Sequence, residues 1–222
     1  MKLLDEAPAS IGHEFIALSA DVTVAILTIL TAGWRRAKAH HDVNAHAGEV
    51  PVTERLRDGM RQALKLDGYP WAKMLLVLPG SEARSREALV PDGRTDIPLV
   101  WLEIFLQYGE HDPHAIVECK RIAGSDTSLC REYVVEGIDR FRSGKYGFNH
   151  AVGFMVGYLL CGTDAEAVAG INGYLTRQGR IDERLRSPAA AAATWASRHG
   201  RASSSPAISL HHAFFEFATA TR

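Results

Sequence analysis

The stretch "HAIVECKRI", residues 114–122, places a glutamate and a lysine inside an otherwise apolar run. A short apolar run bounded by turn residues is typical of a strand buried in a sheet. Burying a charged side chain costs free energy unless the charge is paired or binds a metal. Because alternate side chains of a strand share a face, Glu118 and Lys120 point the same way and Cys119 points to the opposite face. The stretch therefore predicts a buried strand that carries a charged site.

A second carboxylate is expected at the same place. Asp96 comes just before the apolar segment "IPLVWLEIFLQY", and the turn "GEHDP" separates this segment from the strand of Glu118. We predict that the whole segment is one long strand and that the two strands form a hairpin. Carboxylates that converge from paired strands are hard oxygen ligands suited to Mg²⁺ or Mn²⁺. In such a site Lys120 would orient the attacking water or stabilise the negative charge that grows on a phosphate.

The remaining sequence predicts an α/β fold. Apolar periodicity and capping residues indicate helices, and further apolar runs indicate strands. The helices are expected at residues 14–40, about 53–66, about 126–143 and 164–177, and the further strands in "KMLLVLPG", "AVGFMVGYLLCG" and "AISLHHAFFEF". Helices and strands mixed in this order favour a sheet with helices on its faces.

Asp96 followed by Glu118-Cys119-Lys120 at the end of an apolar strand resembles the PD-(D/E)xK, or restriction-endonuclease-like, nuclease superfamily. The resemblance implies a core of helix, three strands, helix and strand, which the expected order matches from residue 53 to 161. It implies hydrolysis of phosphodiester bonds with Mg²⁺ or Mn²⁺ as cofactor, and most often an endonuclease acting on DNA. Asp96 and Glu118 would be metal ligands, and Lys120 would act on the water or the phosphate.

The same resemblance suggests further site residues. Its members often carry an acid on the helix before the first strand, which is the place of Glu54 in "VTERLRDGMRQAL". Glu54 would then be a third catalytic and metal-binding carboxylate. The helix after the ExK strand often carries side chains that touch nucleic acid. Arg131 on this helix, with Arg121 before it and Lys145 after it, would bind the nucleic acid.

The same resemblance also suggests a domain division and a biological role. Residues 1–45 are expected to be a helical appendage, and residues 46–222 the nuclease-like domain. The stretches "FRSGKYG", "GFMVGYLLCG" and the closing residues resemble small bacterial nucleases linked to phage defence. We expect a homodimer or a subunit of a larger complex.

Several alternatives stay open at this point. In "VPDGRTDIPL", Pro91-Asp92-Gly93 spells the family motif literally, but it is also strong turn chemistry, so Asp96 is preferred over Asp92 as the ligand. Glu118 and Lys120 would also fit a simple ion pair at the solvated end of a strand. The chain would then be a non-catalytic subunit with a nuclease fold, or an α/β binding module without a metal.

Composition limits the other classes of function. The 222 residues have a formal net charge of −1, so a polyanion would have to be held by a local patch. The three cysteines are far apart without a CxxC pair, which argues against a disulfide framework and a cysteine zinc site and favours a reducing cytoplasm. The start of the chain lacks the pattern of a signal peptide, and the uncharged run 22–34 is too short for a membrane span. His199, His211 and His212 have no spaced partner motif, so structural or surface roles are expected.

Overall fold

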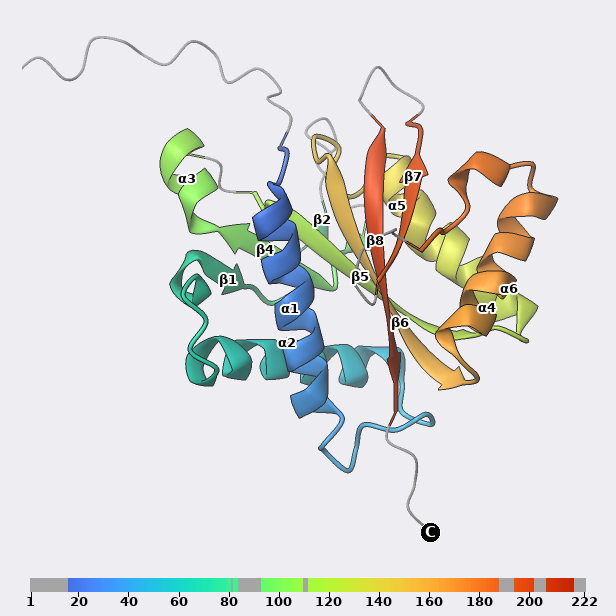
Figure 1. The fold of residues 1–222 in the computed structure, drawn as a ribbon, viewed down its shortest axis with the longest axis horizontal. Coiled ribbons are helices and arrows are strands. Elements are labelled where there is room, and N and C mark those ends of the chain that lie inside the picture. Colours follow the sequence, from blue (N-terminus) through green and yellow to red (C-terminus); the bar gives the residue numbers. More distant parts are fainter. Residues whose placement is uncertain are drawn as a thin grey trace, which may run out of the picture.

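Six strands form one mixed sheet in the computed structural model, which describes residues 16–80, 82–83, 93–109, 112–187, 194–201 and 207–217. In sheet order the strands are β1 (Leu75–Val77), β4 (Ile97–Trp101), β5 (Ala115–Ala123), β6 (Val152–Cys161), β8 (Ile208–Glu216) and β7 (Trp195–His199). The helices are α1 (Ala20–Ala37), α2 (Glu49–Leu66), α3 (Leu102–Tyr108), α4 (Thr127–Tyr133), the π-helix η2 (Val134–Ile138), α5 (Asp139–Arg142) and α6 (Asp164–Arg177). Short 3-10 turns η1 (Ala72–Met74) and η3 (Ile181–Glu183) and a small hairpin of β2 (Glu82–Ala83) and β3 (Gly93–Arg94) complete the set. The predicted α/β class is confirmed (Figure 1).

The strand directions place the charged stretch at the centre of the sheet. β1, β4 and β5 are antiparallel neighbours, and β6 and β8 run parallel to β5. The predicted hairpin is confirmed, because Ile97 on β4 pairs with Val117 on β5. Continuing this register by one residue brings Asp96 opposite Glu118. The two predicted carboxylates are therefore neighbours across paired strands.

The predicted long strand after Asp96 is wrong in its second half. β4 ends at Trp101, and the following seven residues form α3. The sequence "LEIFLQY" consists largely of good helix formers, and Gly109 ends the helix with a φ of 66°. Alternation of apolar residues alone did not separate a strand from a short helix here. Since β4 keeps the residues next to Asp96, the error leaves the hairpin in place.

Two apolar cores fill the space on the two faces of the sheet, one under α1 and α2 and the other under α4, η2 and α6. On the first face Trp34 of α1 stacks on Phe215 and Tyr158 of the sheet, with ring centroids 5.3 and 5.5 Å away. A Cβ atom added to Gly59 of α2 would lie 2.3 Å from the carbonyl oxygen of Gly33. The backbones of α1 and α2 thus touch where they cross. The helix expected as an appendage shares its core with α2 and the sheet.

Two helix boundaries bear on the site. α2 begins at Glu49, four residues before the predicted start, because Pro51 is tolerated in a first turn, where its missing N–H has no acceptor to bind. After β5, Asp126 caps α4 by accepting the backbone N–H groups of Ser128 and Leu129 at 2.8 and 3.0 Å. The following turns widen into η2 before α5 ends near Gly144, close to the predicted stop. Among the helices that the structure describes, none is long and apolar enough to cross a membrane.

Candidate active site

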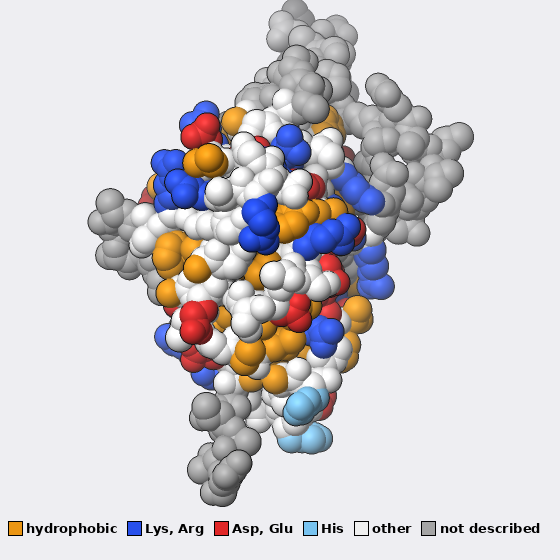
Figure 2. All heavy atoms as spheres, turned by 90° about the vertical axis from the view of Figure 1, so that its right-hand side faces the viewer, with side chains coloured by type: hydrophobic (Ala, Val, Ile, Leu, Met, Phe, Trp, Pro, Cys, Tyr) orange, Lys and Arg blue, Asp and Glu red, His pale blue; other side chains and the backbone are white. Residues whose placement is uncertain are grey.

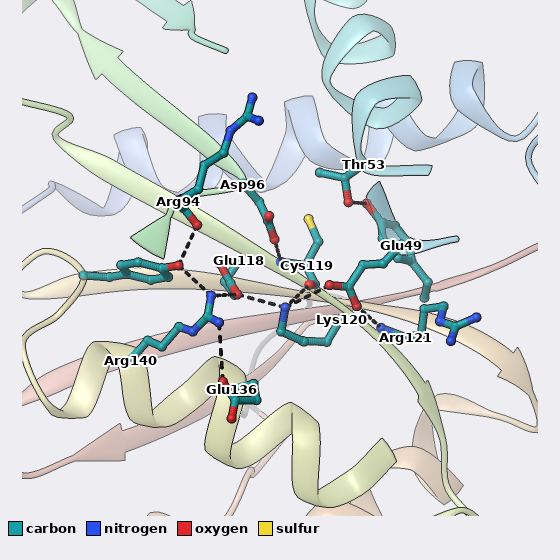
Figure 3. Close-up of polar contacts among 12 residues, drawn as sticks. Glu49, Thr53, Arg94, Asp96, Glu118, Cys119, Lys120, Arg121, Glu136 and Arg140 are labelled. Atoms are coloured by element: carbon teal, nitrogen blue, oxygen red, sulfur yellow. Dashed lines mark hydrogen bonds and ion pairs between the residues drawn. The ribbon is translucent and has the colours of Figure 1, made fainter. Parts of the chain in front are cut away.

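Three carboxylates and one lysine meet where α2, β4 and β5 come together (Figure 3). Glu118 and Lys120 come from β5, Asp96 from the residue before β4, and Glu49 from the first position of α2. Glu118 and Lys120 share the face of β5 that is covered by η2 and α5, as the alternation of the strand predicts. The sequence prediction brought together Asp96, Glu118 and Lys120, and the structure places these three side by side.

Glu118 is the most enclosed of the carboxylates, with no exposed surface. Its Oε1 atom accepts from Lys120 Nζ at 2.9 Å and from Arg140 Nη1 at 3.0 Å. Its Oε2 atom is buried and has no hydrogen-bond partner within the described residues. Burial first, and then the neighbouring Asp96 carboxylate, raise the pKa of Glu118 to about 8, although Lys120 and Arg140 act to lower it. Within the described residues, Glu118 thus has one carboxylate oxygen in two ion pairs and one without a partner.

Asp96 holds the two strands in register. Its Oδ2 atom accepts the backbone N–H of Cys119 at 2.7 Å, so it continues the hairpin beyond the last paired residues. Burial raises the pKa of Asp96, while Lys120 and the Cys119 N–H act in the opposite direction. Two carboxylates with raised pKa values beside each other repel when both are ionised. Such an arrangement favours a ligand that brings positive charge.

Lys120 lies at the centre of the acidic groups. Its Nζ atom contacts Glu118 and Glu49 at 2.9 Å each and donates to the carbonyl of Cys119 at 3.0 Å. Burial acts to lower the pKa of Lys120, but the surrounding carboxylates raise it above its ordinary value. Lys120 is therefore a fixed positive charge rather than a mobile surface lysine. The interpretation as a solvated ion pair at the end of a strand does not describe this environment.

The acid that α2 contributes to this cluster is Glu49, whereas the prediction named Glu54. Glu49 accepts from Lys120 through Oε1 and from the backbone N–H of Arg121 through Oε2 at 3.0 Å. Glu54 is five residues further on, about 140° around the helix, and its carboxylate pairs with Arg57. Arg57 in turn donates to the backbone carbonyl of Asp96 at 3.4 Å, so Glu54 touches the site only through a neighbour. The sequence did hold a signal for Glu49, since Pro51 is favoured in the first turn of a helix.

Arg140 is a site residue that the sequence analysis missed. It lies on α5 and reaches the carboxylate of Glu118, and it also contacts the hydroxyl of Tyr146 at 2.6 Å. The Tyr146 hydroxyl donates to the carbonyl of Arg94 at 2.7 Å, which ties the α5 side of the site to the strand before Asp96. Burial, with the nearby Glu118, raises the pKa of Tyr146 to about 12. No local pattern in the sequence indicates that Arg140 faces Glu118.

Among the described residues, no hydrogen bond or ion pair joins the side chain of a predicted nucleic-acid residue to the carboxylates of the cluster. Arg121 binds Glu49 only with its backbone N–H. Arg131 is exposed on α4, and Lys145 is half-buried in the turn after α5. Among the described residues, no hydrogen bond or ion pair joins Arg131 or Lys145 to the site. Asp92, the alternative to Asp96, lies outside the described residues.

The chemistry of the donors fits a hard divalent cation such as Mg²⁺ or Mn²⁺. Asp96 and Glu118 offer carboxylate oxygens from neighbouring strands, and the buried Oε2 of Glu118 has no partner. Within the part of the chain that the structure describes, no group of three or more His, Cys, Asp or Glu side chains is arranged to hold a metal. Glu49, the third acid, has both oxygens engaged. Asp96 and Glu118 are therefore the residues that would hold the ion.

The histidines near the end of the chain belong to a separate buried network. His199 Nδ1 contacts Glu183 at 2.6 Å, and its Nε2 contacts the hydroxyl of Ser197 at 2.6 Å. Ser197 also contacts His212 Nε2 at 2.7 Å, and the other ring nitrogen of His212 contacts Tyr133 at 3.0 Å. These contacts join η3, β7, β8 and α4. The expected structural role of His199 and His212 agrees with this position.

Comparison with known proteins finds no relative of this chain. No protein-family model matches the chain, and searches of curated proteins and of solved structures find no similar protein. The function must therefore be argued from the geometry of the site itself.

Proposed function

We propose that this protein is a metal-dependent nuclease that hydrolyses phosphodiester bonds, with a core of the restriction-endonuclease-like type. The observation that carries the proposal is the convergence of Asp96, Glu118 and Lys120 from paired strands, with one buried Glu118 oxygen that has no hydrogen-bond partner among the described residues. The order α2, β1, β4, β5, α4 to α5 and β6 supports the proposed core. DNA is the proposed substrate, and an anti-phage role is the proposed setting.

The residues of the chain have distinct proposed roles. Asp96 and Glu118 bind the ion, and Glu49 holds Lys120 close to them through its 2.9 Å contact. The bound ion would polarise the phosphate and lower the pKa of a bound water. Lys120 supplies a fixed positive charge next to the reacting phosphate, where it stabilises the charge of the transition state. Arg140 keeps one oxygen of Glu118 in place, which leaves the other oxygen available.

A second candidate function is favoured by one observation. In this structure Lys120 and Arg140 both contact the same Glu118 oxygen. If these ion pairs are permanent, the cluster is a structural centre, and the protein is a non-catalytic nuclease-fold subunit of a larger assembly. The two candidates differ in whether a divalent cation binds at Glu118.

The test is cleavage of supercoiled plasmid, single-stranded DNA and single-stranded RNA by purified protein in Mg²⁺, Mn²⁺ or EDTA. We expect cleavage in the presence of the divalent ion and its loss in the variant Glu118→Gln. Glu132→Gln is the matched control, because Glu132 is an exposed acid on α4 and makes no hydrogen bond or ion pair with the cluster among the described residues. Calorimetric titration of Mn²⁺ into the wild type and Glu118→Gln gives a readout that does not depend on activity.

The outcomes separate the candidates. Mn²⁺ binding that requires Glu118, together with cleavage, supports the nuclease. Absence of both metal binding and cleavage on all three substrates would reject the nuclease and leave the assembly subunit. Cleavage that persists in Glu118→Gln would show that the activity comes from elsewhere.

A further inference from the structure

A shallow basic hollow lies at the β7 edge of the sheet, away from the carboxylate cluster. Its volume is about 380 Å³, and its charged and polar side chains include Asp182, Arg184, Arg186, Arg198, Ser209 and His211. Figure 2 shows the face of the molecule on the right-hand side of Figure 1, where Lys and Arg side chains gather mainly in the upper half. The protein as a whole has a net charge of −1, so a local excess of arginine stands out.

The strand pairing fixes the floor of this hollow. Arg198 of β7 lies directly across from Ser209 of β8, and Ala196 lies across from His211. All four therefore share one face of the sheet. The ring of His211 stacks on Phe154 with centroids 5.8 Å apart, on the side of the sheet covered by α1. This face is opposite to the one that carries Glu118.

Backbone hydrogen bonds also fix the segment that carries Arg184 and Arg186 at the side of the hollow. Arg186 exchanges two backbone hydrogen bonds with Ala196 of β7, at 2.8 and 2.9 Å, so it extends the sheet edge by one bridge. Arg184 precedes it, and its Nε atom donates to the carbonyl of Ile181 at 3.1 Å. Arg184 and Arg186 therefore line the hollow from the segment that is bridged to β7, and Arg198 lines it from β7 itself.

Among the residues that the structure describes, few partners neutralise the positive charge of this hollow. Arg186 and Arg198 make no hydrogen bond or ion pair through their side chains with any residue that the structure describes. By contrast, the nearby Arg180 pairs with Asp139 and Glu183, at 2.8 and 2.6 Å. The residues that line the hollow include three arginines and a single acidic residue, Asp182.

The neighbouring sequence does not supply the missing negative charge either. Residues 188–193 and 202–206, which follow the two sides of the hollow along the chain, contain no Asp or Glu. Like charges held close together repel, and a bound anion would relieve this repulsion. Guanidinium groups match the geometry of phosphate oxygens and bind them with paired hydrogen bonds. A serine hydroxyl and an imidazole add neutral polar groups of the kind found in such sites.

We propose that the hollow formed by Arg184, Arg186, Arg198, Ser209 and His211 is a binding site for phosphate groups, distinct from the carboxylate cluster. β7 is three strands away from β5 in the sheet, which corresponds to roughly 14 Å at the usual strand spacing. The phosphate would come from the backbone of a nucleic acid or from a small phosphorylated molecule. The inference does not require that the protein cleaves its ligand.

The test is binding in EDTA, so that hydrolysis cannot interfere. The probes are a fluorescently labelled 12-nucleotide single-stranded DNA, followed by anisotropy, and inorganic pyrophosphate, followed by calorimetry. The variants are the double substitution Arg186→Ala with Arg198→Ala and, as a control, Arg177→Ala. Arg177 lies over the ring of Tyr174 on α6 and is not among the lining residues of the hollow. Melting temperature is measured for each protein to show that it is folded.

For a backbone phosphate we expect the double variant to bind the DNA about tenfold or more weakly, and its salt slope to fall by about 1.4 for two lost contacts. Arg177→Ala should bind like the wild type. If only pyrophosphate binding is lost in the double variant, the site still binds phosphate, and its ligand is a small molecule. Equal binding of both probes by the wild type and the double variant would overturn the inference. Equal loss in the double variant and in Arg177→Ala would also overturn it, because general charge would then explain the binding.

Discussion

Replacing Glu118 by glutamine is expected to stabilise the metal-free protein at neutral pH. The substitution keeps the shape of the side chain and removes a carboxyl group that is fully buried and has a pKa raised to about 8 from an ordinary value of 4.5. Between pH 4.5 and 8 the folded protein keeps a proton on Glu118 that the unfolded chain has lost. The free energy of unfolding therefore has its full value below pH 4.5 and falls as the pH rises towards 8. Glutamine cannot lose a proton, so this loss disappears in the variant.

The magnitude follows from the shift. Each pH unit between the unfolded and folded pKa values costs about 1.4 kcal/mol, so at pH 7 the ionisable Glu118 lowers the free energy of unfolding by about 3 kcal/mol. At pH 5 the same calculation gives less than about 1 kcal/mol. In a chain of this length the difference at pH 7 corresponds to a rise in Tm of roughly 10 °C for the glutamine variant.

The assay is urea unfolding of the wild type and Glu118→Gln in EDTA at pH 5, 6, 7 and 8. Only the difference between the two proteins is used, because other groups also titrate in the wild type. Burial lowers the pKa of His150 to about 4 and that of His212 well below its ordinary value, so folding loses stability at low pH through both histidines. The contributions of the two histidines are the same in both proteins, so they cancel when the unfolding free energies of the wild type and Glu118→Gln are subtracted. Glu132→Gln on the exposed face of α4 shows what an amide substitution does by itself.

A difference between wild type and Glu118→Gln that stays constant from pH 5 to pH 8 would refute the reasoning. It would mean that Glu118 keeps an ordinary pKa and that its ion pairs compensate its burial. A variant that is less stable than the wild type at pH 8 would lead to the same conclusion. In either case the site would be a stable salt-bridge centre, as in the assembly candidate.

The remaining predictions concern the residues around Glu118. Lys120→Ala should lower metal-dependent cleavage by about 10²–10³-fold while DNA affinity changes little, since the lost interaction acts mainly in the transition state; an unchanged cleavage rate would contradict the role of Lys120. Glu49→Gln should reduce cleavage and Glu54→Gln should not, because only Glu49 contacts Lys120; the reverse order in a rate assay would restore Glu54. Asp96→Asn should abolish cleavage, and Asp92→Asn should do less; a stronger effect at Asp92 in the same assay would reverse the assignment.

The pairing of the two strands was predictable from the sequence, but their register was not. The apolar runs on both sides of "GEHDP" indicated the hairpin, and the period of two put Glu118 and Lys120 on one face. The expected closeness of Asp96 and Glu118 is confirmed, but it depends on α3, because a strand that continued to Tyr108 and closed at "GEHDP" would put Asp96 opposite Asp126. The helix Asp164–Arg177 was predicted with its observed bounds, and in the structure Thr163 and Glu166 form a capping box at its start.

The remainder of the site depends on contacts that a local pattern does not contain. Arg140 reaches Glu118 from another element, through the packing of α5 on the sheet. The helix was expected to begin at about residue 53, which left Glu49 outside it, although proline is tolerated in the first turn of a helix. Because the predicted helix began four residues too late, its first acid was Glu54, and Glu49 was not considered as a site residue.

The close crossing of α1 and α2 limits how this chain can be shortened. A fragment that begins after residue 45 would uncover the surface on which Ile26, Ile29, Leu30 and Trp34 are packed, all of them at most 4% exposed. Burying side chains of this size contributes about 1.5–3 kcal/mol each, so their loss removes roughly 6–12 kcal/mol, which is comparable to the whole stability of a typical domain. The smallest piece of this protein that is suitable for the assays above therefore starts before α1, at residue 19 or earlier, so that Ser19 still caps the helix.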